Sequence, residues 1–356
     1  MKIGITFGCY APLHQGHLDL IMRAKKENDM AFVVVCGYDN EARTSAIGLD
    51  LNAKTKLIKE YLEDDILKVF SINDTELGID ESMSESNWHI WLQYCMNQIN
   101  RHFSNTENHI TFYVAEEKYK DAIKKERNDF DVVLVDRTLN PISGTLCREN
   151  PIKYWNKIAK PFRGLLSHNI LIAGTASEGK TTLVRDIAKY FGTAYSYEKG
   201  RDNCEWKTDN EFDIKDFLYN LYEQRKYNEE LIHSDANNGI FISDTDNMVT
   251  LMYADAYCKR EKFALSKEDY EVLYNVAKAY VPTTKWNKIF LLAPHQKPIV
   301  DDGQRYMPDS DYQIRLQFFE KLKSLYDEFG YKYEILTGDY YSNYLKIKNY
   351  IGGLYE

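Results

Sequence analysis

The chain has 356 residues, of which 44% are hydrophobic and 28% charged, a composition typical of a soluble globular protein long enough for two domains. The 54 Asp and Glu residues outnumber the 45 Lys and Arg residues and give a net charge of −9, which argues against nucleic acid or an anionic membrane as the main partner. The sequence shows no signal peptide and no apolar run of membrane-spanning length, and its six cysteines form no C-x-x-C pair, which argues against a zinc site. We therefore expect a cytoplasmic protein without membrane insertion.

The first half of the chain alternates strand-like and helix-like patterns. Residues 2–8 form a strand that begins almost at residue 1, which leaves no room for an N-terminal helix-turn-helix. The other expected strands are 31–35, 68–72, 110–114 and 132–135, and the expected helices are 18–26, 53–62, 87–103 and 119–126. This alternation predicts a parallel sheet with helices on both faces and ligands at the carboxyl ends of its strands.

A glycine turn with two histidines follows the first strand, in Gly8-Cys-Tyr-Ala-Pro-Leu-His-Gln-Gly-His17. His14 and His17 are three residues apart at the start of a helix, so both rings can face one side. The N-terminus of a helix favours an anion there. The pattern therefore predicts a phosphate contact, and the alternative is a pair of packed or surface histidines.

The loop after the last strand of the first half reads Asp136-Arg-Thr-Leu-Asn-Pro-Ile-Ser-Gly-Thr-Leu-Cys-Arg148. Ser143 and Thr145 can cap a helix whose first turn carries Arg148. An arginine near the same helix N-terminus indicates a second phosphate contact.

Residues 151–166 contain basic residues among aromatics, and Pro161 should break any long helix here. We expect the basic residues to form a solvated face. The predicted domains are residues 1–150 and 167–356, with residues 151–166 as a connector.

The second half repeats the alternation, with strands expected at 170–173, 194–197, 240–243, 289–292 and 333–336. After the first of these, Gly174-Thr-Ala-Ser-Glu-Gly-Lys-Thr181 matches G-x-x-x-x-G-K-[ST] and precedes a helix, the order of a P-loop. Lys180 should reach the β- and γ-phosphates of ATP, and Thr181 should hold Mg²⁺. The alternative is a glycine-rich turn without a ligand. The loop residues expected to bind ATP are Gly174, Glu178, Gly179, Lys180, Thr181 and Thr182.

Acidic side chains follow two other strands of the second half. Asp244 and Asp246 come directly after strand 240–243, the arrangement of a Walker B carboxylate that completes Mg²⁺ binding. Glu198 and Arg201 lie at the end of strand 194–197. The alternative for the two aspartates is helix capping.

H-x-G-H at 14–17 and I-S-x-T-x-x-R at 142–148 resemble the nucleotidyltransferase superfamily, whose adenylyltransferase branch uses both motifs on one ATP. With a P-loop kinase behind them, the whole chain resembles the NadR-type bifunctional proteins, which join nicotinamide-mononucleotide adenylyltransferase to ribosylnicotinamide kinase. The resemblance implies an α/β fold in which a Rossmann-like nucleotidyltransferase domain precedes a P-loop kinase domain. Many members carry a DNA-binding regulator at the front. Because the first expected strand, 2–8, leaves no room for one, we expect no repressor role and no nucleic-acid partner here.

The resemblance implies roles in the transferase domain. Gly8, Cys9 and Tyr10 should pass close to ATP, His14 and His17 should bind its phosphates, and Ser143, Thr145 and Arg148 should hold the β- and γ-phosphates. Asn87 and Trp88 fall at the family's N-G-W, whose Trp stacks on nicotinamide; here the glycine is missing. Trp88 and Trp91 could equally form one packed helix face. Glu116 or Glu117 resembles the family's S-E-x-x-Y.

In the kinase domain, a carboxylate must orient or deprotonate the 5′-hydroxyl of the riboside. Asp244 is expected at Mg²⁺ or as the base, with Glu198, Arg201 and Asp246 nearer the riboside; the base itself stays open between these carboxylates. Asp302 and Arg305 resemble the family's D-G-x-R lid, in which Arg305 should fold over the transferring phosphate of ATP and Asp302 should help to fix the loop. The alternative is a plain surface loop.

The implied function is phosphorylation of nicotinamide riboside by ATP, followed by adenylyl transfer to the mononucleotide, giving NAD and pyrophosphate. The mononucleotide phosphate is largely dianionic near neutral pH, since its second pKa is about 6, so no covalent intermediate is needed. One alternative keeps both folds but changes the nucleoside. Another is a nucleotide-sensing partner of a riboside transporter with a weak transferase site. We also expect a homo-oligomer, and functional coupling to such a transporter.

Overall fold

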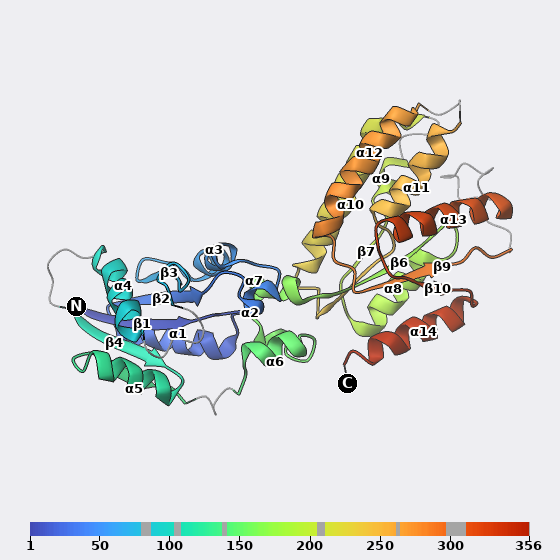
Figure 1. Cartoon of the computed structure of the whole chain (residues 1–356). Coiled ribbons are helices and arrows are strands. Elements are labelled where there is room, and N and C mark those ends of the chain that lie inside the picture. The colour runs from blue at the N-terminus through green and yellow to red at the C-terminus, as the bar shows by residue number, and fades with distance from the viewer. Residues whose placement is uncertain are drawn as a thin grey trace. The chain divides into compact units, whose positions relative to one another are not determined.

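The computed structural model describes residues 1–79, 87–102, 108–136, 141–204, 211–260, 264–296 and 311–355 (Figure 1). The chain divides into two compact units, Met1–Leu166 and Ser167–Glu356. Each unit contains one five-stranded sheet, and every strand pair in both sheets is parallel. The predicted α/β fold with two parallel sheets is confirmed.

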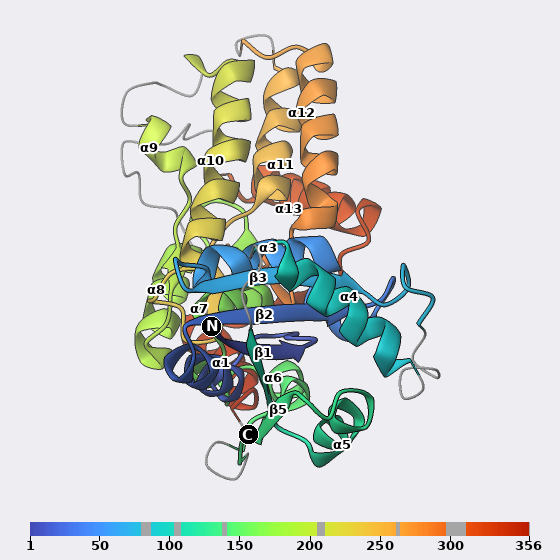
Figure 2. The same cartoon turned by 90° about the vertical axis from the view of Figure 1, so that its left-hand side faces the viewer.

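The sheet of the first unit has the strand order β3-β2-β1-β4-β5, and Figure 2 shows β3, β2 and β1 lying side by side. Alternate residues of β2 enter different cores, because successive side chains of a strand point to opposite faces. Val33 and Val35 pack with α1 and α3, whereas Phe32 and Val34 pack with α4 and α5. The strands are β1 Lys2–Gly8, β2 Met30–Gly37, β3 Leu67–Asn73, β4 His109–Val114 and β5 Asp131–Leu134.

Helices cover both faces of this sheet, as predicted. The helices are α1 Gln15–Glu27, α2 Ala42–Ser45, α3 Leu51–Leu62, α4 Trp88–Asn100, α5 Glu117–Glu126, α6 Gly144–Glu149 and α7 Lys160–Arg163, with 3-10 turns at η2 Trp155–Lys157 and η3 Gly164–Leu166. Residues 151–166 belong to the first compact unit, where Trp155, Ile158 and Phe162 are buried. No long helix forms in residues 151–166, in agreement with the prediction, and Pro161 lies in the first turn of the four-residue helix α7, where its missing N–H costs no hydrogen bond.

The sheet of the second unit has the strand order β10-β9-β6-β8-β7, so the strand before the glycine loop is central. Leu171 and Ala173 of β6 pack into a core with α10, α11, α12 and α13. On the other face, α8 contacts β6, and Tyr350 of α14 lies 5.6 Å from Phe290 of β9, measured between ring centroids. The strands are β6 His168–Gly174, β7 Tyr195–Ser196, β8 Ile240–Ser243, β9 Lys288–Leu292 and β10 Glu334–Leu336.

The helices of the second unit lie between these strands in sequence. They are α8 Lys180–Phe191, α9 Gly200–Cys204, α10 Ile214–Ile232, α11 Asn247–Cys258, α12 Lys267–Tyr280, α13 Tyr312–Glu328 and α14 Tyr340–Gly352, with a 3-10 turn at η5 Val281–Thr283. Within the described residues, no helix combines the length and apolar character needed to cross a lipid bilayer.

Candidate active sites

The two histidines of the first unit lie together at the start of α1. His14 is the residue before the helix, and the His14 and His17 rings are stacked with centroids 3.6 Å apart. The Tyr10 and His17 rings form a T-shaped pair with centroids 4.9 Å apart. The Tyr10 hydroxyl forms a hydrogen bond with the Thr6 hydroxyl at 3.0 Å. Tyr10 is buried, and its backbone φ of +50° turns the chain sharply after Gly8. The turn thus presents two imidazoles beside a helix N-terminus, where an anion is favoured.

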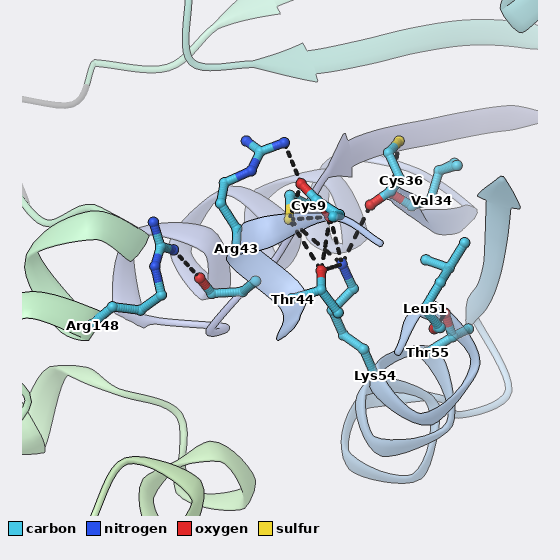
Figure 3. Close-up of polar contacts among 11 residues, drawn as sticks. Cys9, Val34, Cys36, Arg43, Thr44, Leu51, Lys54, Thr55 and Arg148 are labelled. Atoms are coloured by element: carbon cyan, nitrogen blue, oxygen red, sulfur yellow. Dashed lines mark hydrogen bonds and ion pairs between the residues drawn. The ribbon is translucent and has the colours of Figure 1, made fainter. Parts of the chain in front are cut away.

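The second transferase motif meets the first through Arg148. Ser143 caps α6 by accepting from the backbone N–H of Leu146 at 3.2 Å. Arg148 donates to the carbonyl of Ala11, within the histidine turn (Figure 3). It also donates to the Thr145 hydroxyl. A side chain at Gly144 would approach the same Ala11 carbonyl at 3.0 Å, so glycine permits this close contact. The structure therefore brings together His14, His17, Ser143, Thr145 and Arg148 at one end of the first sheet.

A buried polar cluster adjoins this turn, and sequence reasoning missed it. Lys54 of α3 is fully buried and donates to the Thr44 hydroxyl at 2.9 Å, while its Nζ lies 3.6 Å from the Glu41 carboxylate. The Cys9 thiol donates to Glu41 at 3.1 Å and lies 3.5 Å from Lys54 Nζ (Figure 3). Arg43 is half-exposed and pairs with Glu41. The cluster fixes the backbone at Cys9, a residue expected to pass close to ATP.

Charges within this cluster are mutually compensated. Burial raises the pKa of the Cys9 thiol, so Cys9 acts as a neutral donor to Glu41. Burial also acts to raise the pKa of Glu41, but hydrogen bonds from Thr44 and Cys9 together with the charges of Arg43 and Lys54 outweigh it, and the pKa is lowered. A sequence signal for Lys54 exists: it precedes Ile58 and Leu62 at helical spacing, which places it on the buried face of α3.

Trp88, the candidate nicotinamide contact, lies in an aromatic cluster. Its ring is 5.6 Å from Phe7, 5.6 Å from Trp91 and 5.9 Å from Tyr119. This is the packed helix face that was the alternative, although Trp88 itself stays partly exposed. Asn87 is the residue before α4, and Ser86 lies outside the described residues.

Glu116 and Glu117, the weaker candidates, lie at the start of α5. Each forms an ion pair with a nearby lysine: Lys118 Nζ lies 3.1 Å from Glu116, and Lys120 Nζ lies 2.7 Å from Glu117.

The glycine loop of the second unit joins β6 to α8. Gly174 has φ +155°, and a Cβ there would lie 2.8 Å from the carbonyl oxygen of Leu292 on β9, so only glycine fits. Ser177 has φ +68°, and its buried Oγ has no hydrogen-bond partner among the described residues.

Lys180 is buried and its Nζ donates to the Thr175 carbonyl at 2.7 Å. Burial lowers the pKa of Lys180, while Glu198 and Asp244 oppose the shift. The loop is shaped for an anion, and its strain persists because β9 and α8 hold both ends.

Asp244 lies at the tip of β8, facing this loop. Thr181 Oγ1 donates to Asp244 Oδ2 at 2.7 Å, while the buried Oδ1 has no hydrogen-bond partner in the described part of the chain. Burial raises the pKa of Asp244 to about 6, and the nearby charge of Glu198 adds to the shift. A hydroxyl and an unsatisfied carboxylate oxygen are ligands that Mg²⁺ accepts. No group of three or more His, Cys, Asp or Glu side chains suited to a metal occurs within the described ranges.

Glu198 and Arg201 lie in the turn that leads into α9. Arg201 Nε donates to Glu198 at 3.4 Å, and both side chains are partly exposed. Gln224 of α10, which sequence reasoning missed, holds the turn: it accepts from the backbone N–H of Lys199 at 2.8 Å and donates to the carbonyl of Tyr197 at 3.2 Å. The charges of Glu198 and Arg201 both contribute to the pKa shifts of Lys180 and Asp244.

Asp246 has a different environment. It accepts from the backbone N–H groups of Met248 and Val249 at 3.0 and 3.3 Å and so caps α11. It also accepts from the Tyr326 hydroxyl at 2.8 Å, and burial raises its pKa to about 6. This is the helix-capping alternative, and the carboxylate faces the core.

Four further candidates remain. Thr182 lies in the first turn of α8, and Glu178 is paired with Arg315 of α13. Arg305 and Asp302 lie outside the described residues, so their predicted roles stay predictions.

Comparison with known proteins agrees with this geometry. Residues 5–150 match a family model described as cytidylyltransferase-like, and residues 169–342 match one described as an AAA domain. The trifunctional NAD biosynthesis/regulator proteins NadR of Salmonella typhimurium and Escherichia coli are each 28% identical over 211 residues, covering 56% of this chain. The chain spans about half the length (49%) of these curated relatives.

Two solved structures resemble the chain over nearly its whole length. A crystal structure of NadR protein in complex with NR has 31% sequence identity and a TM-score of 0.85, and the match covers 99% of this chain and 96% of that one. A crystal structure of NadR protein in complex with NAD and AMP-PNP has 29% identity and a TM-score of 0.83, with the same coverage. Both units and their order match, and the chain belongs to the NadR family.

Proposed function

We propose that the chain is a bifunctional enzyme of NAD biosynthesis. The second unit phosphorylates nicotinamide riboside with ATP, and the first transfers AMP from a second ATP to the mononucleotide, giving NAD and pyrophosphate. The observation that supports this most is the presence of one phosphate cradle in each unit: stacked imidazoles beside Arg148 in the first, and a strained glycine loop with Lys180 in the second. Relatives bound to NR, and to NAD with AMP-PNP, carry ligands of these chemical classes.

The transferase reaction needs alignment and charge neutralisation more than proton transfer. A phosphate oxygen of the mononucleotide attacks the α-phosphorus of ATP, the bond from that phosphorus to the β-phosphate oxygen breaks, and pyrophosphate leaves. His14 and His17 lie where they can donate to phosphate oxygens at the start of α1. Arg148, tied to Ala11 and Thr145, supplies a positive charge at the same turn.

The kinase reaction joins the 5′-hydroxyl oxygen of the riboside to the γ-phosphorus of ATP and releases ADP. Lys180 and the loop amides neutralise the transferring phosphate. Thr181 donates to Asp244, so we assign these two side chains to hold Mg²⁺, which would neutralise phosphate charge when bound. Glu198 is partly exposed and its charge acts on Asp244, so we assign to Glu198 the acceptance of the hydroxyl proton.

Substitution of Lys180 separates the two activities. Lys180→Ala removes the cation of the glycine loop, and we expect phosphorylation of nicotinamide riboside to fall by about 10²-fold or more while adenylyl transfer is unchanged. Product formation from riboside plus Mg-ATP, and separately from mononucleotide plus Mg-ATP, can be followed by mass spectrometry. Loss of both activities together would contradict independent sites.

Substitution of His17 should give the reverse pattern. His17→Ala removes one imidazole of the stacked pair, so NAD formation from the mononucleotide should fall by about 10²-fold while riboside phosphorylation continues. His109→Ala is a suitable control, because His109 is an exposed histidine of the same unit, paired with Asp131 away from the turn. Unimpaired NAD formation in His17→Ala would defeat the assignment of the transferase site. Phosphorylation of uridine but not of nicotinamide riboside by the unmodified protein would change the substrate.

A further inference from the structure

Glu178 lies inside the glycine loop, yet its carboxylate is engaged by residues outside it. Arg315 Nη1 forms an ion pair with Glu178 Oε1, to which the Thr175 hydroxyl also donates at 3.3 Å. The backbone N–H of His295 donates to Glu178 Oε2 at 3.3 Å, and His295 Nε2 lies 3.5 Å from the same oxygen. Both carboxylate oxygens are therefore committed to protein partners.

Arg315 links Glu178 to His295, and we call these three residues the joint. It comes from α13, and its second nitrogen, Nη2, donates to the carbonyl oxygen of His295 at 2.7 Å. The backbone of His295, which follows β9, is thus held on both sides: its N–H by Glu178 and its carbonyl by Arg315. A planar guanidinium can reach both acceptors at once, which a lysine ammonium cannot do in the same geometry.

The joint is almost closed to solvent, since the Arg315 and Glu178 side chains are 2% and 1% exposed. A buried charge that loses its partner is strongly unfavourable, so each side chain holds the other in place. The charge of Glu178 also reaches the catalytic lysine, because it contributes to raising the pKa of Lys180 against the effect of burial. The joint therefore adjoins the phosphate cradle both mechanically and electrostatically.

We propose that Glu178 is a positioning residue for the kinase reaction, which fixes the glycine loop to α13 and to the end of β9 through Arg315 and His295 and does not itself touch the nucleotide. This inference rests on the proposed use of the loop for ATP. The sequence alone suggested a loop residue in contact with ATP, and the geometry assigns its carboxylate to the protein instead.

The first test is Glu178→Gln in the full-length protein. We expect the KM for ATP in riboside phosphorylation to rise about tenfold or more, because a misplaced loop loses aligned contacts. The KM for the riboside and the adenylyl-transfer activity of the first unit should not change. Affinity for Mg-AMP-PNP, measured by calorimetry with the transferase site blocked by His17→Ala, should fall by a similar factor. Glu334→Gln is the matched control, since Glu334 pairs with Lys288 at the opposite end of β9.

Two further variants test the joint if Glu178→Gln folds poorly. Replacing Glu178 and Arg315 together by Met removes both buried charges and should restore folding, while the KM for ATP stays raised. Arg315→Lys keeps the positive charge but cannot contact Glu178 and the His295 carbonyl at once, so we expect an intermediate rise in the KM for ATP. Because the two residues act as a unit, the double variant should be little worse than Glu178→Gln.

The outcomes are distinguishable. A Glu178→Gln protein that is less stable but has an unchanged KM for ATP would show a merely structural role and overturn the proposal. Tighter binding of Mg-AMP-PNP would show that the carboxylate faces and repels the nucleotide, which would also overturn it. If the unmodified protein binds Mg-AMP-PNP but phosphorylates no riboside, the proposed substrate fails, and the nucleotide affinities of the variants still decide the role of Glu178.

Discussion

His168 is the first residue of β6, and its ring makes the second unit sensitive to acid. Nε2 lies 2.9 Å from the Tyr350 hydroxyl of α14, and burial, with a smaller effect of Lys285, lowers the pKa of His168 to about 4. An unfolded histidine has a pKa of about 6.5, so the folded state binds fewer protons between these values. The stability that His168 contributes is therefore complete above about pH 6.5 and is lost as the pH falls towards 4.

The corresponding prediction concerns His168→Gln, which keeps a hydrogen-bonding side chain but cannot titrate. Between pH 7 and pH 5, the Tm of the second unit should fall less in His168→Gln than in the unmodified protein, as measured by calorimetry. His233→Gln provides the control, because His233 is an exposed histidine directly after α10 that pairs with Glu229. Equal falls in all three proteins would mean that His168 does not contribute to acid sensitivity.

Single residues also show where sequence reasoning succeeds and where it stops. Asp244 directly follows one apolar strand, and Lys180 ends the glycine loop after another, so their positions near the sheet edge could be predicted from the chain order. Asp246, two residues further, could not be separated from Asp244 by any pattern. Its carboxylate caps α11 and also accepts a hydrogen bond from Tyr326, which lies far along the chain on α13. The positions of the Glu178 and Gln224 side chains likewise depend on partners that are far away in the sequence.

At the scale of elements, the loop between β6 and α8 depends on one glycine more than on the others. Gly174→Ala would place a Cβ 2.8 Å from the Leu292 carbonyl, at a φ of +155° that L-residues rarely adopt. Gly192, which caps α8, also has a positive φ of +62°, but open space surrounds it. We therefore expect Gly192→Ala to cost about 1–2 kcal/mol from backbone strain alone, and Gly174→Ala to cost more.

Urea denaturation of both variants, followed by tyrosine and tryptophan fluorescence, would measure these costs, with riboside phosphorylation as a second readout. Gly174→Ala should also lose most kinase activity, because β9 or the loop must move. Equal losses of stability in the two variants would contradict the close contact between the loop and β9.

The order and type of the long elements could be predicted, because the apolar runs of both sheets are short, buried and separated by helical patterns. Helix α2 (Ala42–Ser45) was missed, since four residues are too few to show a helical period. The fully buried Lys54 was missed for another reason. A lysine on an apolar helix face is unusual, and only the polar cluster formed with Glu41 and Thr44 makes its burial tolerable.

At the scale of the whole molecule, the two compact units should be separable. Each has its own sheet and core, and the division falls between Leu166 and Ser167. We propose that fragments 1–166 and 167–356 fold alone, each with a cooperative unfolding transition, and that each keeps one of the two activities. Residues 151–166 should be needed by the first fragment, because Trp155, Ile158 and Phe162 are buried there.

Calorimetry and product analysis of the separate fragments would check this expectation. A fragment 1–150 provides the comparison, since it lacks those three side chains and should unfold at a lower temperature. If fragment 1–166 fails to fold while the full chain is stable, the units depend on one another.

The central place of β6 has a consequence for synthesis on the ribosome. This strand pairs with β8 on one side and with β9 on the other, so its second edge stays open until Leu292 has been made. About 120 residues separate His168 from Leu292, and at about 5–20 residues per second their translation takes roughly 6–25 s. During that interval the nascent chain exposes an apolar edge strand, which can pair with other chains. Avoiding aggregation therefore depends on fast elongation or on a chaperone that covers this strand.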